Sequence, residues 1–236
     1  MKRTVLTLLA AMLSTACVCV PSATAAPVFL STSFYNPALL LPSPPADGSP
    51  AARAEMDELH RIEKNRTADQ FARAKADDEN ESVTAFSDVM GPSFDLKMLP
   101  QTAALFADVQ AEEKTAAKLA KDYFKRNRPW VVDPSLKSCA QGDAPQSSYP
   151  SGHATMGYSM AVVLAALAPE KAQAIMARAS DYAENRLVCG MHYRRDIVAG
   201  EVLGTTVAVE LLATPGFKSE FDAAEDELRA AHIVAN

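Results

Sequence analysis

Residues 150–167 constrain the fold more than any other stretch. Pro150-Ser151-Gly152-His153 leads directly into an apolar run at residues 154–167. Proline ends the element before it, serine is a favoured helix N-cap, and the run has the length of a helix. The first amides of a helix lack intrahelical partners and carry the positive end of its dipole. This helix start can therefore hold an anion beside His153.

The rest of the chain is typical of helices. Helical patterns occupy residues 50–66, 82–90, 100–126, 169 to about 185, 196–212 and 215–231, and Thr67 with Gln70 forms a capping box for a further helix up to about Asn80. A loop rich in proline and glycine covers residues 129–150. Strand patterns are nearly absent and no repeat is found. The sequence predicts an all-α, single-domain helical bundle.

The N-terminus is typical of an export signal. Lys2 and Arg3 precede an apolar run to residue 20, and Ala23 and Ala25 form a small-residue cleavage pattern. We expect a signal peptide at residues 1–25, a domain at 26–236 with a proline-rich arm at 26–50, and a periplasmic location. Lipid attachment at Cys17 is the alternative, but the serine that opens that sequence suits it poorly.

Charge and cysteine content narrow the function classes. The net charge of −6 argues against a broad nucleic-acid-binding or anionic-membrane surface, and no stretch after the signal is long enough to cross a bilayer. Any anion site must be local. After cleavage two cysteines remain, Cys139 and Cys189, and an even pair in an oxidising compartment predicts a disulfide.

A basic cluster precedes the central motif. It contains Lys121, Lys125, Arg126 and Arg128, and Pro129 follows at once. We interpret Lys125 and Arg126 as a solvated helix C-terminus that complements the dipole. Because proline fixes the backbone beside it, Arg128 can grip two oxygens of a phosphate, and Lys121 can add a point charge.

A second cluster follows the central motif and contains Arg186, His192 and Asp196. His192 and Asp196 are four residues apart, so on a helix the carboxylate can meet the imidazole ring. A carboxylate on one ring nitrogen leaves the other as a lone pair for attack. The alternative is a structural ion pair. His60 and His232 lie on ordinary amphipathic patterns and are expected at the surface.

Together the three stretches resemble the phosphatidic acid phosphatase type 2 (PAP2) superfamily, and within it the soluble bacterial class A non-specific acid phosphatases. The superfamily pattern is lysine, six residues, Arg-Pro; then Pro-Ser-Gly-His; then Ser-Arg, five residues, histidine, three residues, aspartate. The matching positions are Lys121, Arg128, Pro129, Pro150, Ser151, Gly152, His153, Arg186, His192 and Asp196. One departure is Asn185, where the pattern has serine.

The resemblance implies roles for these residues. His192 would attack phosphorus and form a phosphohistidine, Asp196 would orient its ring, and His153 would protonate the leaving alcohol. Lys121, Arg128, Arg186, the Ser151 hydroxyl and the Gly152 amide would bind the equatorial oxygens. The scheme implies phosphomonoester substrates, transfer to other alcohols, an acidic to near-neutral optimum, a homo-oligomer and no metal or other cofactor.

Four alternatives remain open. Cys189 to Arg195 spells the Cys-x5-Arg skeleton of a cysteine-dependent phosphatase, but glycines are missing from its middle. A vanadate-dependent haloperoxidase would use the same pocket, although this chain is short for that group. Membrane lipid phosphatases share the pattern but need further apolar spans. A non-catalytic periplasmic phosphate-binding module would use the cations and leave both histidines without a purpose.

Overall fold

The structure, a computed structural model, describes residues 29–31 and 33–235. The expected signal peptide and the first residues of the arm lie outside the described residues. The α-helices are α1 Pro37–Leu40, α2 Pro50–Asn65, α3 Ala68–Asp78, α4 Ser87–Met90, α5 Pro100–Phe124, α6 Pro129–Val132, α7 Gly152–Leu167, α8 Ala172–Val188, α9 Arg194–Ala213 and α10 Pro215–Ala230; the 3-10 turns are η1 Val83–Phe86 and η2 Pro169–Lys171. No strand occurs in this described part, so the predicted all-α class is confirmed.

Several predicted helix starts are confirmed by their caps. The Ser49 hydroxyl accepts a hydrogen bond from the Ala52 amide (3.2 Å) at the start of α2. Thr67 and Gln70 bond reciprocally at the start of α3. Several boundaries differ from the prediction, and α9 begins at Arg194 rather than at Asp196. The expected loop contains α6, α8 runs three residues beyond Asn185, and the expected helix at residues 82–90 is split into η1 and α4.

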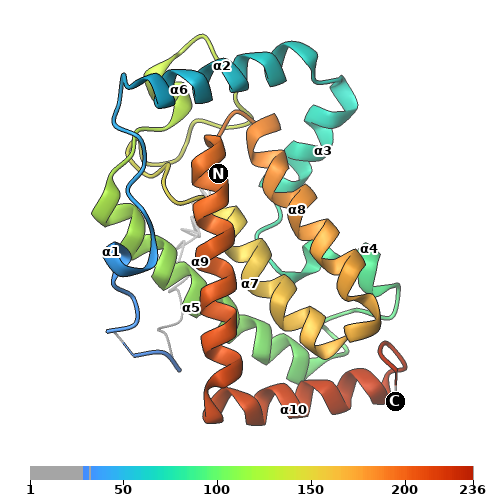
Figure 1. Ribbon diagram of the computed structural model, residues 1–236. Coiled ribbons are helices and arrows are strands. Elements are labelled where there is room, and N and C mark those ends of the chain that lie inside the picture. Colours follow the sequence, from blue (N-terminus) through green and yellow to red (C-terminus); the bar gives the residue numbers. More distant parts are fainter. Residues whose placement is uncertain (1–28, 32, 236) are drawn as a thin grey trace, which may run out of the picture.

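The predicted central helix, α7, is the core of the bundle (Figure 1). Helices α8 and α9 flank it, and α5 and α10 also pack against it. It contains no Lys, Arg, Asp or Glu, and residues such as Ala154, Val163 and Leu164 are completely buried. An apolar helix without a polar face needs neighbours on all sides to remove it from water.

Two glycines of α9 set the distance between α9 and α7. A Cβ atom built on Gly204 would lie 2.2 Å from the carbonyl oxygen of Thr155, and one on Gly200 would lie 2.6 Å from that of Ser151. These distances are far below van der Waals contact, so only glycine allows the two backbones to touch here. This contact fixes the start of α7 against the first turns of α9.

The first described residues are tied to the bundle. The Glu112 carboxylate on α5 accepts hydrogen bonds from the amides of Phe29 (2.7 Å) and Leu30 (3.2 Å). At the other end, α10 lies across the bottom of the bundle in Figure 1. Within the described residues no single helix is long and apolar enough to cross a bilayer; the pair α9–α10, bent by 91°, passes by length and composition.

The predicted disulfide joins Cys139 to Cys189, with Cα atoms 4.9 Å apart. The Cys139 amide also donates to the Cys189 carbonyl (2.9 Å). The bridge therefore ties the loop before α7 to the turn that follows α8. That turn leads directly to His192.

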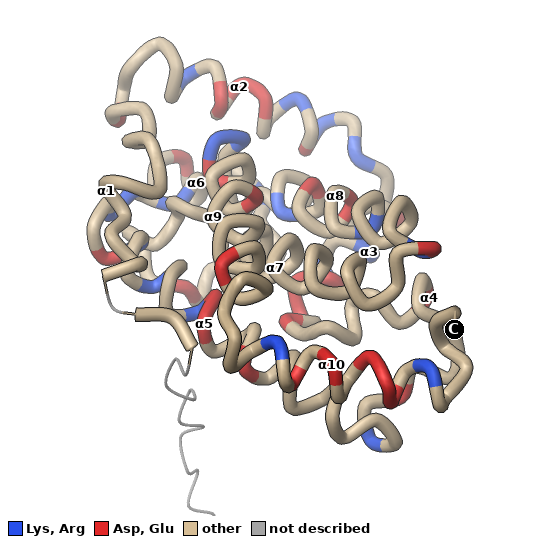
Figure 2. The backbone as a smooth tube through the Cα atoms, turned by 60° about the horizontal axis from the view of Figure 1, so that its bottom comes forward, with Lys and Arg blue, Asp and Glu red and all other residues tan. Residues whose placement is uncertain are grey.

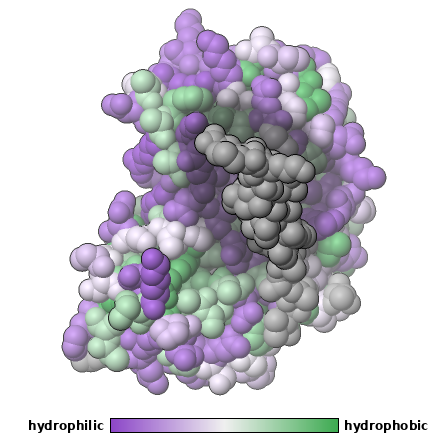
Figure 3. Space-filling model, turned by 180° about the vertical axis from the view of Figure 1, so that it is seen from behind, coloured by the Kyte–Doolittle hydropathy of each residue, from purple (hydrophilic) through white to green (hydrophobic). Residues whose placement is uncertain are grey.

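Charges lie mainly on the outer helices. Figure 2 shows both signs along α2 and α10, while α7 in the interior has none. The face opposite to the view of Figure 1 is hollowed, with hydrophilic residues along the hollow (Figure 3). Polar groups are thus concentrated at the surface and at a few internal positions.

Candidate active site

His192 lies in the turn between α8 and α9 and is 1% exposed. Its Nδ1 atom is 2.7 Å from the carbonyl oxygen of Ser148. A carbonyl can only accept, so Nδ1 carries the hydrogen and Nε2 has the lone pair. The Arg128 guanidinium donates to that lone pair, with Nη1 2.8 Å from Nε2. Burial, and then the charge of Arg128, lower the pKa of His192 well below its usual value.

Asp196 is near His192, but not through a shared helix as the spacing predicted. His192 precedes α9, which begins at Arg194, and Asp196 lies in the first turn of that helix. Its carboxylate is 3.5 Å from Nδ1 of His192, farther than the Ser148 carbonyl. It accepts from the Ser148 hydroxyl (2.6 Å) and the Tyr193 amide (2.9 Å). Asp196 therefore holds the segments on both sides of the ring.

The prediction of a solvated Arg126 is wrong. This side chain is 5% exposed, and its guanidinium bridges the carboxylates of Asp196 and Glu55, each at 2.6 Å. It also lies over the Tyr193 ring, 4.1 Å from the centroid. Burial raises the pKa of Asp196, and the charge of Arg126 counteracts that shift. Arg126, which follows the C-terminus of α5, is buried because Glu55 of α2 and Asp196 of α9 pack against it.

We predict that Arg126→Met lowers the free energy of unfolding by about 3 kcal/mol, because it leaves two buried carboxylates without their cation. Urea unfolding followed by circular dichroism measures this change. The matched control is Lys125→Met, one residue away on an exposed side chain. Equal stability of the two variants would show that the buried cation is dispensable.

Lys121 and Arg128 line the same cavity as Gly152, the first residue of α7. A Cβ atom on Gly152 would lie 3.7 Å from Cε of Lys121, so the lysine runs beside the first residue of α7. Lys121 donates to the carbonyl of Ser147, and Arg128 donates to the Ser147 hydroxyl (3.2 Å) and pairs with Asp143 (2.8 Å). Burial and the charge of Arg128 lower the pKa of Lys121 to about 7.

His153 lies in the first turn of α7 and is 8% exposed. Its Nε2 atom is 3.1 Å from the carbonyl oxygen of Asp78 and 3.2 Å from the carboxylate of Glu81. Its ring stacks on Tyr182 of α8, with centroids 5.8 Å apart. Burial, and then the charge of Arg186, lower the pKa of His153 well below its usual value. Both effects favour the neutral form of the ring.

Arg186 and Ser151 lie deeper than the residues above. Arg186 is 1% exposed on α8 and pairs with the Asp78 carboxylate. The Ser151 hydroxyl caps α7 by accepting from the Ala154 amide (3.3 Å). Its own hydrogen remains available as a donor. Asn185, the departure from the superfamily pattern, donates to Asp77 (2.7 Å) and so ties α8 to α3.

One cavity of about 370 Å³ connects five of the predicted residues. Its lining includes Lys121, Arg128, Gly152, His153 and His192, together with Ser147, Asp143, Glu81 and Glu113. Lys121 from α5 and Arg128 from the segment before α6 therefore line the same cavity as His192, at the start of α7, and Arg128 contacts its Nε2 atom. Three further predicted site residues do not line this cavity, namely Arg186, Ser151 and Asp196.

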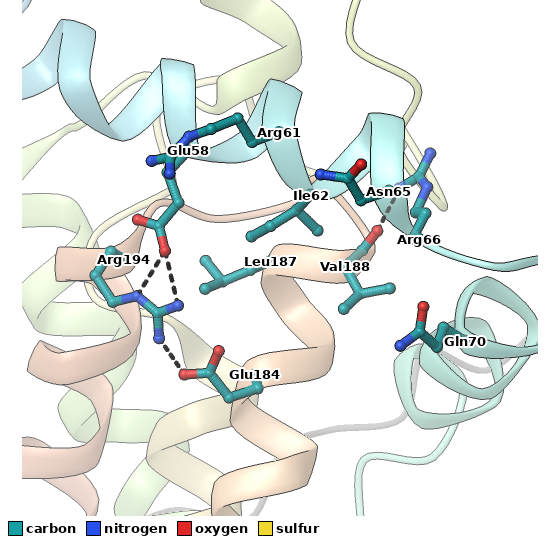
Figure 4. Close-up of a pocket in the computed structure, with 10 residues that line it drawn as sticks. All are labelled: Glu58, Arg61, Ile62, Asn65, Arg66, Gln70, Glu184, Leu187, Val188 and Arg194. Atoms are coloured by element: carbon teal, nitrogen blue, oxygen red, sulfur yellow. Dashed lines mark hydrogen bonds and ion pairs between the residues drawn. The ribbon is translucent and has the colours of Figure 1, made fainter.

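A larger pocket of about 510 Å³ lies between α2, α3, α8 and the start of α9 (Figure 4). Its lining side chains include Arg194, which binds Glu58 (2.8 Å) and Glu184. None of the predicted catalytic residues lines it. The chemistry therefore favours the smaller cavity, because that cavity contains the histidines and the phosphate-binding cations.

Sequence reasoning missed several residues of the site. Ser147 and Asp143 contact Arg128 from the irregular loop, Asp78 pairs with Arg186 from the end of α3, and Glu55 pairs with Arg126 from α2. No periodicity marks the loop residues, and the two acids look like ordinary charges on helix surfaces. They are recognisable only once the helices are in place.

Comparison with known proteins finds relatives over most of the chain. The model of the PAP2 superfamily matches residues 104–219. The acid phosphatase of Zymomonas mobilis subsp. mobilis is 29% identical over 85% of this chain and 78% of its own. The non-specific acid phosphatase of Salmonella typhimurium is 29% identical over 82% of this chain and 80% of its own, and that of Salmonella typhi is 28% identical over 88% and 86%.

The fold is also similar to that of a solved structure. This is the crystal structure of the first transmembrane PAP2 type phosphatidylglycerolphosphate phosphatase from Bacillus subtilis, with a TM-score of 0.52 and 18% identity. The alignment covers 73% of this chain and 89% of that one. Motifs, fold and relatives lead to the same conclusion, that the chain belongs to the PAP2 superfamily as one of its phosphatases.

Proposed function

We propose that this phosphatase is an exported, periplasmic non-specific acid phosphatase that hydrolyses phosphate monoesters through a phosphohistidine. The observation that carries the proposal is the environment of the Nε2 atom of His192. Its tautomer is set by the Ser148 carbonyl, and a guanidinium lies 2.8 Å from its lone pair. A phosphate drawn to Arg128 and Lys121 would thus lie in front of a nucleophile.

In the first step, Nε2 of His192 forms a bond to phosphorus and the bond from phosphorus to the ester oxygen breaks. The leaving oxygen takes a proton from His153, and the alcohol departs. The developing charge on the three equatorial oxygens is met by Lys121, Arg128, Arg186 and the donors at the start of α7. These donors are held in place before the substrate binds.

In the second step, neutral His153 takes a proton from water, and the water oxygen attacks phosphorus. The N–P bond breaks, and inorganic phosphate and free His192 are regenerated. Another alcohol in place of water would give a new phosphomonoester by the same route. Phosphotransferase activity therefore belongs to the proposal.

Bound phosphate also changes the pKa of His153. Burial and the neighbouring cations favour the neutral form of His153, yet a general acid must carry a proton. A bound phosphoryl group brings negative charge beside those cations and so raises the pKa of His153. Substrate binding therefore favours the protonated form of the general acid, which takes its proton from solvent.

We predict turnover of p-nitrophenyl phosphate in excess chelator, with kcat/KM falling as the pH rises through about 7, the pKa of Lys121. A lysine is charged below its pKa, so the site attracts phosphate most strongly below that pH and loses one cation above it. A pH series of initial rates measures this limb. A rate maximum above about pH 8, or loss of turnover with chelator, would contradict the proposal.

The binding module and the haloperoxidase predict different results from the phosphatase. A binding module would retain stoichiometric phosphate without turnover. A vanadate enzyme would oxidise halide in the presence of vanadate and peroxide. The cysteine-dependent alternative has no support in the structure, because Cys189 is in the disulfide with Cys139.

A further inference from the structure

The cavity has a second end, away from the phosphate-binding groups. Glu113, Ala117 and Lys121 lie on one face of α5, each one turn from the next, and all three line the cavity. The Cα atoms of Glu113 and Lys121 are about 12 Å apart along the helix axis. Ala117 between them is small and leaves room. The leaving group of a bound ester would lie along this face.

Glu113 is an unusual residue for such a position. It is 2% exposed, yet within the described part of the chain its carboxyl group makes no hydrogen bond or ion pair. Burial holds the pKa of Glu113 well above its usual value. The negative charge of the neighbouring Glu81 adds to this upward shift. Buried polar groups are normally satisfied, and one that is not and that faces a cavity suggests a missing partner.

Glu81 provides a second carboxylate from another element. It lies between α3 and η1, lines the same cavity and contacts His153 at 3.2 Å. Gln110, one turn before Glu113 on α5, donates to the backbone carbonyl of Glu81 and so holds this segment on the helix. Glu81 is therefore close enough to disfavour a second negative charge on Glu113.

We propose that Glu113 is a specificity-determining residue for the leaving group and binds a positively charged nitrogen. The preferred substrates would be phosphomonoesters of amino alcohols. This inference rests on the proposed function and names its substrate class. An ammonium group between Glu81 and Glu113 allows both carboxylates to ionise, whereas an anionic group would add a third negative charge.

Besides Glu81 and Glu113, the charged or titratable residues that line this cavity are Lys114, Lys118, Lys121 and Asp122 on α5, together with Arg128, Asp143, His153 and His192. Lys114 is a neighbour whose charge acts on Glu113 without forming an ion pair with it. Lys121 and Arg128 are neutralised by the bound phosphate, so they do not repel the ammonium group. In acid Glu113 must lose a proton to bind the ammonium, so the preference should grow as the pH rises.

The experiment compares kcat/KM for aminoalkyl phosphates of two to four carbons with that for hydroxyalkyl phosphates of the same length. We expect the best amino ester to be preferred by about tenfold, the size of a hydrogen bond to a charged group. In Glu113→Gln, which keeps the shape and removes the charge, the ratio should fall to about one. The matched control is Asp122→Asn, another acid of the cavity, which is paired with Lys118 and should leave the ratio unchanged.

A ratio near one in the wild type would overturn the inference, and so would an unchanged ratio in Glu113→Gln. If Glu113→Gln does not fold, as judged by its circular dichroism, the wild-type ratio still decides. Failure of the proposed function itself has a different signature, because p-nitrophenyl phosphate would then not be hydrolysed. The two failures are thus distinguishable.

Discussion

His192→Ala is expected to lower kcat/KM for p-nitrophenyl phosphate by about 10⁴-fold or more, since it removes the atom that attacks phosphorus. The cations that bind phosphate remain, so the variant should still bind inorganic phosphate. Steady-state rates and calorimetric phosphate binding measure the two effects. A variant that lost both properties would point to a disturbed site rather than a missing nucleophile.

The control for this experiment is another histidine. His232 is exposed, lies beyond α10 and has a positive φ of 56°. His232→Asn keeps a residue that tolerates this backbone conformation and should leave kcat unchanged. Rapid acid-free quenching of the wild type with labelled substrate should trap a phosphoryl group on His192. Label on Cys189 or on no residue would contradict the phosphohistidine.

Gly204→Ala is expected to lower the free energy of unfolding by about 3 kcal/mol, because its methyl group would overlap the backbone of α7. The new Cβ atom would lie 2.2 Å from the Thr155 carbonyl oxygen and 2.9 Å from the Ser159 amide. Backbone atoms cannot rotate away, so the helices must separate. For a chain of this size the melting temperature should fall by about 6–12 °C.

The matched control is Gly142→Ala. Gly142 lies in the exposed loop, and a Cβ atom there would meet nothing within 4 Å. Its φ is not in the left-handed region, so alanine should be neutral or slightly stabilising. Calorimetry of the two variants measures both changes. Equal melting temperatures for Gly204→Ala and Gly142→Ala would contradict the close contact of α7 and α9.

Much of the fold could be read from local chemistry. Ser49 and Thr67 mark helix starts because their hydroxyls satisfy backbone amides of the same turn, an interaction that needs no distant residue. The apolar run after Gly152 had to be buried. Boundaries that depend on packing were less accurate, such as the extra turn of α8 and the short helix α6.

The candidate site divides in the same way. Lys121, Arg128, His153 and His192 could be proposed from motifs, since each motif keeps its residues close along the chain. The burial of Arg126 could not be predicted in this way. Arg126 stands one residue from exposed Lys125, and only the arrival of Glu55 from α2 and Asp196 from α9 buries it.

The sequence by itself determined the helical class, the disulfide pair and the residues that carry the proposed chemistry, because these depend on periodicity, cysteine count and short motifs. The tertiary structure decided how those residues are used. It placed the Ser148 carbonyl, rather than Asp196, on Nδ1 of His192 and left Glu113 without a partner beside the site. Such contacts join elements distant in sequence, so their geometry exists only after the helices have packed.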